Sequence, residues 1–248
     1  MSPSVLKQQQ LATPRLPRVA KYSVENAIQF GWGSVTNNLH PERTSELNNY
    51  LIGPRVLDAG CGGGGYVNQL LQDGFDAYGI ETNCEFVHIA RTRCPNGRIL
   101  QGTIEALPFS SKFFDTTFSF DVLEHVDDMT AIRELYRVTA KRLIVTVPRE
   151  NGELQQFGLA FATYTDLTHL RYYSLDQFRV LLSTVPHSSI NIEEEVAIDF
   201  RSLAANTLTV RLPVPGFSWF GTKILRSLVR HCDQKKMCAG LVGVVDLA

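Results

Sequence analysis

Apolar and polar positions follow two alternating periods through the middle of the chain. Short apolar runs suit buried strands, and stretches with an apolar residue every three or four positions suit amphipathic helices. The first pattern predicts strands at 55–59, 75–80, 98–101, 114–120 and 142–147, and the second predicts helices at 66–73, 84–93 and 129–138. Because strands and helices alternate, we expect an α/β fold in which right-handed crossovers build a parallel sheet with helices on both faces.

The pattern changes after Pro148. Residues 149–173 are rich in aromatic and turn-forming residues without a clean period, and 200–237 has the character of an insertion. The remaining expected elements are a helix at 174–183 and strands at 190–198 and 240–246. We therefore expect a loose tail at 1–20, followed by a single domain at 21–248.

A glycine-rich segment follows the first expected strand directly. Its glycines are Gly60, Gly62, Gly63, Gly64 and Gly65, at the junction with the next expected helix. Glycines there let the backbone turn sharply and approach a ligand, whose polar groups meet the N-terminus of the helix. The segment therefore predicts a nucleoside-type cofactor site rather than a plain surface turn.

The glycines alone leave the identity of the cofactor open. Gly60, Gly62 and Gly65 satisfy the G-x-G-x-x-G spacing of dinucleotide sites. Glu81, at the end of the second expected strand, suits either cofactor, because a carboxylate there accepts hydrogen bonds from ribose hydroxyls. An NAD(P)-dependent oxidoreductase is therefore one alternative.

Three motifs that follow one another along the chain favour one of these cofactors. They are Asp58-Ala-Gly-Cys-Gly-Gly-Gly64, Gly102-Thr-Ile-Glu-Ala-Leu-Pro-Phe109 and Phe114-Asp-Thr-Thr-Phe-Ser-Phe-Asp-Val-Leu-Glu-His-Val126. They resemble the cofactor loop, the adenine-side segment and the fourth strand of class I S-adenosylmethionine-dependent methyltransferases. The resemblance covers about residues 40–185 and implies a Rossmann-like, seven-stranded, mostly parallel sheet with a last antiparallel strand.

One subgroup of this family matches further. Leu39-His-Pro-Glu-Arg43, Glu124-His125 and Thr168-His169 resemble segments of the O-methyltransferases of ubiquinone biosynthesis, and the last pair also recurs in methyltransferases of glycan and natural-product pathways. The chain departs from the family where Thr103 replaces an acid and where Thr139-Ala-Lys-Arg142 replaces a Pro-Gly-Gly turn.

The resemblance implies S-adenosyl-L-methionine as the cofactor. Arg43 would hold its carboxylate, Glu81 its ribose, and Thr103 with Ile104 its adenine. The other implied contacts are Asp58, Gly60, Cys61, Gly62, Thr82 and Phe120.

Two histidines are the candidates for chemistry. A sulfonium already makes its methyl group electrophilic, so the enzyme mainly aligns the acceptor. A hydroxyl acceptor also benefits from a base, which is most often histidine. His125 and His169 fit this role, although His125 also fits a capping or packing role and His169 fits the ordering of its loop. We expect a small-molecule acceptor, such as a quinone precursor, a sugar or a natural-product hydroxyl, with oxygen preferred over nitrogen or carbon.

Metal binding is a second possible function of the same region. Asp121, Glu124 and His125 stand at i, i+3 and i+4, so on a helix they would share one side and could bind a divalent cation. Acids at a helix start also cap the helix and suit its dipole. Capping is the preferred interpretation, and we assign no metal ligand.

Two segments beyond the motifs carry alternative interpretations. The aromatic residues of 149–173 suit a lid over the site or ordinary core packing. Residues 217–231 include an amphipathic helix, for which packing on the sheet is preferred over peripheral membrane contact. No apolar run approaches the roughly 20 residues of a transmembrane helix.

Composition changes this picture little. The formal net charge of −1 gives no reason to expect a nucleic-acid partner, and the five cysteines include no C-x-x-C pair, which favours reduced thiols and a cytoplasmic location. A partner subunit that binds the cofactor without catalysis is the remaining alternative function.

Overall fold

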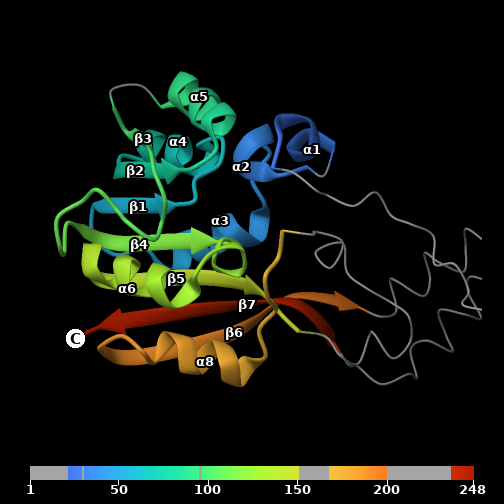
Figure 1. Cartoon of the computed structure of the whole chain (residues 1–248), viewed down its shortest axis with the longest axis vertical. Helices are drawn as coiled ribbons and strands as arrows, with labels where there is room; N and C mark the ends of the chain where they lie inside the picture. The colour runs from blue at the N-terminus through green and yellow to red at the C-terminus, as the bar shows by residue number, and fades with distance from the viewer. Residues whose placement is uncertain (1–21, 30, 95–96, 151–167, 200–235) are drawn as a thin grey trace, which may run out of the picture.

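The sheet has the strand order β3-β2-β1-β4-β5-β7-β6 in a computed structural model that describes residues 22–29, 31–94, 97–150, 168–199 and 236–248. Strands β1 to β5 run parallel to one another, whereas β7 runs antiparallel to both β5 and β6 (Figure 1). The strands are β1 Arg55–Ala59, β2 Asp76–Glu81, β3 Ile99–Gln101, β4 Phe114–Phe120, β5 Thr139–Pro148, β6 His187–Asp199 and β7 Lys236–Leu247. The expected Rossmann-like α/β sheet with a last antiparallel strand is confirmed.

Helices cover both faces of the sheet. One face packs against α6 and α8, and the other packs against α3, α4 and α5. Two short helices, α1 and α2, precede them and lie beside α5 (Figure 1). The helices are α1 Val24–Gln29, α2 Gly33–Thr36, α3 Pro41–Tyr50, α4 Gly65–Gln72, α5 Cys84–Arg93, the 3₁₀ turn η1 Leu123–His125, α6 Asp128–Val138 and α8 Leu175–Leu182.

Local sequence explains where the main helices begin. The side chains of Asn83, Asp127 and Ser174 accept hydrogen bonds from the first backbone N–H groups of α5, α6 and α8, and Ser174 forms a capping box with Gln177. The expected helix boundaries agree with these elements to within one residue. Strand ends differ more, because β5 begins at Thr139 instead of 142 and β7 begins at Lys236 instead of 240. Both additions pair with a neighbouring strand, which sequence periodicity alone does not reveal.

Several expectations fall outside the described residues. These are the tail at 1–20, most of the lid-like segment at 149–173, and the insertion at 200–237 as far as residue 235, with its amphipathic helix; residues 236 and 237 belong to β7. Within the described part of the chain, no helix is long and apolar enough to cross a membrane.

Candidate active site

A cavity of about 800 Å³ opens at the carboxyl ends of the parallel strands. Open α/β sheets bind their ligands at this edge. Eleven of the twelve expected site residues line it: Arg43, Asp58, Gly60, Gly62, Glu81, Thr82, Thr103, Ile104, Phe120, His125 and His169. Cys61 does not line the cavity. The fold thus brings residues from the ends of four strands and from α3 to one space.

The glycine loop after β1 forms the floor of the cavity. Gly60 has φ +93°, and a Cβ there would lie 2.4 Å from Val122 Cγ2. Gly62 has φ +52°, and a Cβ there would lie 2.6 Å from Ser34 Oγ. Side chains therefore do not fit at either position, because of both conformation and space. The loop keeps its backbone open toward the cavity, as a nucleoside-binding cradle requires.

Glu81 ties this loop to the end of β2. Its Oε2 accepts a hydrogen bond from the backbone N of Gly62 at 2.9 Å, and its Oε1 accepts one from the backbone N of Asn83 at 2.8 Å. Thr82 Oγ1 lies 3.3 Å from the same Oε1. The Glu81 carboxylate therefore stands at the cavity wall with its position fixed by two backbone donors.

Asp58 lies deeper, at the end of β1. It is 3% exposed, and its Oδ2 has no hydrogen-bond partner among the described residues. Burial, and then the charge of Glu81, raise the pKa of Asp58 well above its usual range. A buried carboxyl oxygen without a donor, beside a cradle kept clear of side chains, fits a ligand that brings hydrogen-bond donors into the cavity.

Cys61 faces away from the cavity. Its side chain is fully buried in the core beside Val67, and a Cβ on Gly79 would lie 2.7 Å from its sulfur. Burial and the nearby Asp58 raise the pKa of its thiol well above its usual value. At this position only the backbone can meet a cofactor.

The adenine-side residues also reach the cavity. Ile104 is 3% exposed and joins the hydrophobic core, whereas the Thr103 hydroxyl donates to Glu105 Oε2 at 2.8 Å. Phe120 lies edge-on to Tyr66, with 5.7 Å between the ring centroids.

Arg43 lies among three carboxylates rather than alone. Its Nη2 donates to Asp121 Oδ2 at 2.8 Å, and its Nη1 forms ion pairs with Glu46 at 3.3 Å and with Glu195 of β6. The guanidinium carbon lies 5.0 Å from the centroid of the Phe120 ring. Burial opposes the charge of Arg43, but Asp121 and Glu46 outweigh it and raise its pKa.

The contact with Arg43 corrects one expectation. Asp121, Glu124 and His125 would share one side only if the loop were helical from residue 121, but Asp121 has φ +56° and precedes the 3₁₀ turn that holds the other two. Its carboxylate is directed to Arg43 instead. The i, i+3, i+4 spacing was misleading because the chain turns in the left-handed region after β4 before any helical turn begins.

Glu46 provides a pH-dependent test of this network. Burial raises the pKa of Glu46 from 4.5 to about 7, although Arg43 acts in the opposite direction. The native state therefore holds a proton that the unfolded chain releases near its ordinary pKa, so this group lowers native stability as pH rises through that window. We expect Glu46→Gln, which stays neutral, to gain stability relative to the wild type between about pH 5 and pH 8, measured by urea unfolding.

The matched control for this prediction is Glu42→Gln. Glu42 lies on the same helix but is exposed. An equal gain in both variants, or a gain for Glu46→Gln that falls as pH rises, would contradict the assigned pKa direction.

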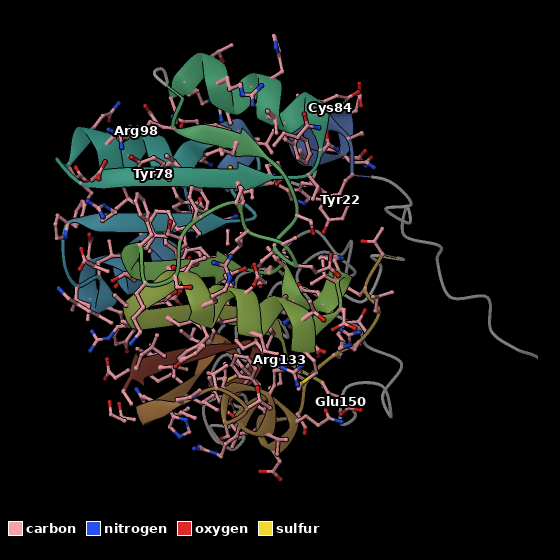
Figure 2. The ribbon with its side chains drawn as sticks, turned by 60° about the vertical axis from the view of Figure 1, so that its left-hand side comes forward. Tyr22, Tyr78, Cys84, Arg98, Arg133 and Glu150 are labelled. Carbon is pink, nitrogen blue, oxygen red and sulfur yellow. The ribbon has the colours of Figure 1, made fainter. Side chains whose placement is uncertain are left out.

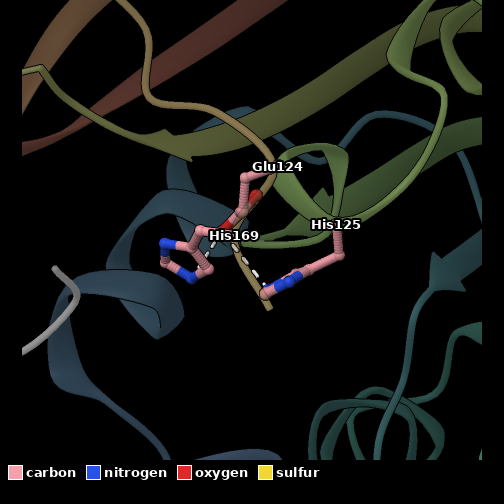
Figure 3. Close-up of side chains that lie close together, drawn as sticks. All are labelled: Glu124, His125 and His169. Atoms are coloured by element: carbon pink, nitrogen blue, oxygen red, sulfur yellow. Dashed lines mark ion pairs between the residues drawn. The ribbon is translucent and has the colours of Figure 1, made fainter. Parts of the chain in front are cut away.

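Glu124, His125 and His169 lie close together and all line the cavity (Figure 3). The Glu124 side chain is 1% exposed, and its Oε1 lies 3.8 Å from His125 Nε2 and 3.9 Å from His169 Nε2. The two imidazole rings are 4.6 Å apart between centroids, at 68°. One buried carboxylate thus faces two imidazoles that both reach the cavity.

His125 is held on both of its ring nitrogens. Its Nδ1 lies 3.2 Å from the carbonyl oxygen of Thr168, and its Nε2 is hydrogen-bonded to the hydroxyl of Tyr22. The three ligand atoms of the cluster lie within 4.8 Å of one another, a nitrogen and oxygen donor set that a divalent metal could use. Because the Tyr22 hydroxyl already engages His125 Nε2, we assign no metal here.

Sequence reasoning did not find Tyr22 or Glu195. Both line the cavity, but Tyr22 lies just beyond the expected tail and Glu195 lies on a strand after the motifs. No local motif marks either residue, so only their position in the fold identifies them.

The comparisons with known proteins agree with this geometry. Residues 57–145 match the family described as "Methyltransferase domain". A ubiquinone biosynthesis O-methyltransferase of Sinorhizobium fredii is 31% identical over 168 residues, which are 62% of this chain and 66% of that protein. A malonyl-[acyl-carrier protein] O-methyltransferase of Pectobacterium atrosepticum is 29% identical over 151 residues, 60% of this chain and 56% of that protein. The chain therefore spans less than two thirds of the length of these curated relatives.

A solved structure gives the same fold. A SAM-dependent methyltransferase from Archaeoglobus fulgidus superposes with a TM-score of 0.63 at 15% identity, covering 91% of this chain and all of the other chain. At this identity the likeness supports the architecture of the sheet and not a particular acceptor.

Proposed function

Because the chain carries a class I S-adenosylmethionine-dependent methyltransferase domain, we propose that it transfers the methyl group of S-adenosylmethionine to an oxygen of a small-molecule acceptor. The observation that carries the proposal is that one cavity of about 800 Å³ is lined both by the glycine cradle with Glu81 and by the Glu124–His169 pair. The cavity has room for a nucleoside cofactor and a small acceptor.

The cofactor half of the cavity consists of backbone and carboxylates. The loop at Gly60 and Gly62 would meet the amino-acid portion of the cofactor, and Glu81 would accept hydrogen bonds from the ribose hydroxyls. The remaining proposed contacts are Arg43, Asp58, Thr82, Thr103, Ile104, Phe120 and the backbone of Cys61. Arg43 would bind the cofactor carboxylate in competition with Glu195 and Asp121, which engage it here.

The acceptor half provides a base. When bound, S-adenosylmethionine supplies an electrophilic methyl group, so the protein has to orient the acceptor and take up its proton. His169 suits the second task, because its Nε2 faces the buried carboxylate of Glu124, which stabilises an imidazolium. His125 holds the wall beside it, since both of its nitrogens are already engaged.

Calorimetric titration with S-adenosylhomocysteine tests the proposal directly, with NADH as the parallel ligand. We expect binding of the first alone. In Glu81→Gln, the affinity for S-adenosylhomocysteine should fall about 10- to 150-fold, the equivalent of about 1.5–3 kcal/mol for a hydrogen bond to a charged group. Glu85→Gln is the control, because this exposed acid lies on α5 outside the cavity wall.

The outcomes separate the alternatives. Binding of NADH alone would favour the oxidoreductase and overturn the proposal, although the family match does not favour that alternative. A wild type that binds S-adenosylhomocysteine but methylates none of a panel of catechol, sugar and carboxylic-acid acceptors would favour a non-catalytic partner subunit. The expected cytoplasmic location stays a prediction.

A further inference from the structure

Tyr22 connects the two halves of the cavity. Its ring lies edge-on to His125, with 5.1 Å between the ring centroids, and tilted to Trp32 at 5.0 Å. Its hydroxyl is hydrogen-bonded to His125 Nε2, and its main-chain carbonyl accepts a hydrogen bond from Asn83 Nδ2 at 2.8 Å. Figure 2 shows Tyr22 between Cys84 of α5 and Arg133 of α6, on the side where the strands end. One residue thus contacts both the loop after β2 and the histidine wall.

The Asn83 contact links Tyr22 to the cofactor half. The Asn83 backbone N donates to Glu81 Oε1 at 2.8 Å, while its Oδ1 accepts from Glu85 N and Phe86 N at the start of α5. The backbone N and both side-chain polar groups of Asn83 therefore have defined partners. Asn83 thus links the Tyr22 main chain by hydrogen bonds to Glu81, the carboxylate that would bind the ribose.

The hydroxyl contact restrains the His125 ring. Thr168 contacts the His125 Nδ1 through its carbonyl oxygen at 3.2 Å, which can only accept, and through its hydroxyl oxygen at 3.1 Å, which can donate or accept. An Nδ1–H that donates to the carbonyl leaves the Nε2 of a neutral imidazole as an acceptor, and the Tyr22 O–H then donates to it. The hydroxyl thereby favours one tautomer and one orientation of the ring that packs against His169.

We propose that Tyr22 is a positioning residue of the methyl-transfer site, whose hydroxyl fixes His125 beside the Glu124–His169 pair and whose main chain is anchored through Asn83 next to Glu81. This inference rests on the proposed function and deepens it. Loss of the hydroxyl releases the His125 ring, and the acceptor wall formed by both histidines loses its fixed shape. The ring of Tyr22 alone would only fill the small hydrophobic cluster around Phe86 and Trp32.

Tyr22→Phe separates these two roles, because it keeps the ring and removes the hydroxyl. The first measurement is the ¹⁵N spectrum of histidine-labelled full-length protein, with the His125 signals assigned from His125→Asn. In the wild type we expect a protonated Nδ1 and a hydrogen-bonded, unprotonated Nε2. In Tyr22→Phe we expect the Nε2-protonated tautomer to gain population, which moves the exchange-averaged Nε2 resonance upfield and the Nδ1 resonance downfield.

A second variant removes the hydrogen bond that anchors the Tyr22 main chain. Asn83→Asp keeps an oxygen that caps α5 but removes the Nδ2 donor to the Tyr22 carbonyl. We expect the His125 signals to change in the same direction as in Tyr22→Phe. The control is Tyr50→Phe, which removes an exposed hydroxyl bonded to Glu193 and is expected to leave the His125 spectrum unchanged.

Kinetics give the functional readout. With an acceptor from the panel, Tyr22→Phe should lower kcat about three- to tenfold, the scale of one hydrogen bond, with the cofactor KM unchanged. An unchanged His125 spectrum in Tyr22→Phe would overturn the inference, and so would a full kcat despite a changed spectrum. A wild type that fails to bind S-adenosylhomocysteine would overturn the proposed function and the methyl-transfer role of Tyr22 together, whereas a changed spectrum would still establish the Tyr22–His125 contact.

Discussion

Replacement of His169 with asparagine is expected to lower the rate of methyl transfer about 10²–10⁴-fold, the usual contribution of a general base. The side chain is 7% exposed, faces Glu124 across 3.9 Å and lines the cavity, so no bulk water replaces it in the same position. The rate is measured with saturating S-adenosylmethionine and an acceptor identified by the screen. The affinity for S-adenosylhomocysteine should stay close to that of the wild type, because His169 is not among the proposed cofactor contacts.

The control for His169→Asn is His187→Asn. His187 is exposed on β6, where its Nδ1 contacts the carbonyl oxygen of Val185. Full activity of His169→Asn in a folded protein would contradict the role of base. A loss of activity accompanied by an equal loss of S-adenosylhomocysteine binding would assign His169 to cofactor binding instead.

Phe178→Ala is expected to destabilise the protein by about 3–5 kcal/mol, the cost of removing a large buried aromatic side chain. Phe178 is fully buried on α8 and packs against β7 at Gly243. A Cβ on Gly243 would lie 2.9 Å from Phe178 Cε1, so the ring occupies space that the glycine leaves clear. Urea unfolding measures the difference.

The control for Phe178→Ala lies on the same helix. Val180 is 67% exposed, and Val180→Ala should change the free energy of unfolding by about 0.5 kcal/mol or less. A loss of less than about 1 kcal/mol for Phe178→Ala would show that α8 contributes little to holding β6 and β7 on the sheet.

The glycine loop and the position of Glu81 beside it could be predicted from the sequence because their determinants are local. The strand, the glycines, the helix and Glu81 follow one another within 27 residues, from 55 to 81, and each constrains the backbone where it stands. Gly60 and Gly62 adopt positive φ, as the turn requires. Parallel pairing of β1 with β2 then places Glu81 beside the loop.

For Cys61 and Asp121, the local sequence did not predict the direction of the side chain. The motif includes Cys61 among possible cofactor contacts, but packing against Gly79 turns its thiol away from the cavity. Asp121 has the spacing of a shared helical face, but its positive φ and the nearby Arg43 give it another partner. In both cases a tertiary neighbour decided the direction of the side chain.

The sequence by itself determined the alternation of strands and helices, the α/β class and the position of the cofactor loop, because these follow from periodicity and from backbone conformations that only certain residues adopt. Only the tertiary structure decided which residues surround the proposed acceptor-binding part of the cavity. The Tyr22–His125 contact joins residues 103 positions apart, and the Arg43–Glu195 ion pair joins residues 152 positions apart. Such contacts depend on the strand order of the sheet and on how the N-terminal helices pack over it, which no local pattern of residues encodes.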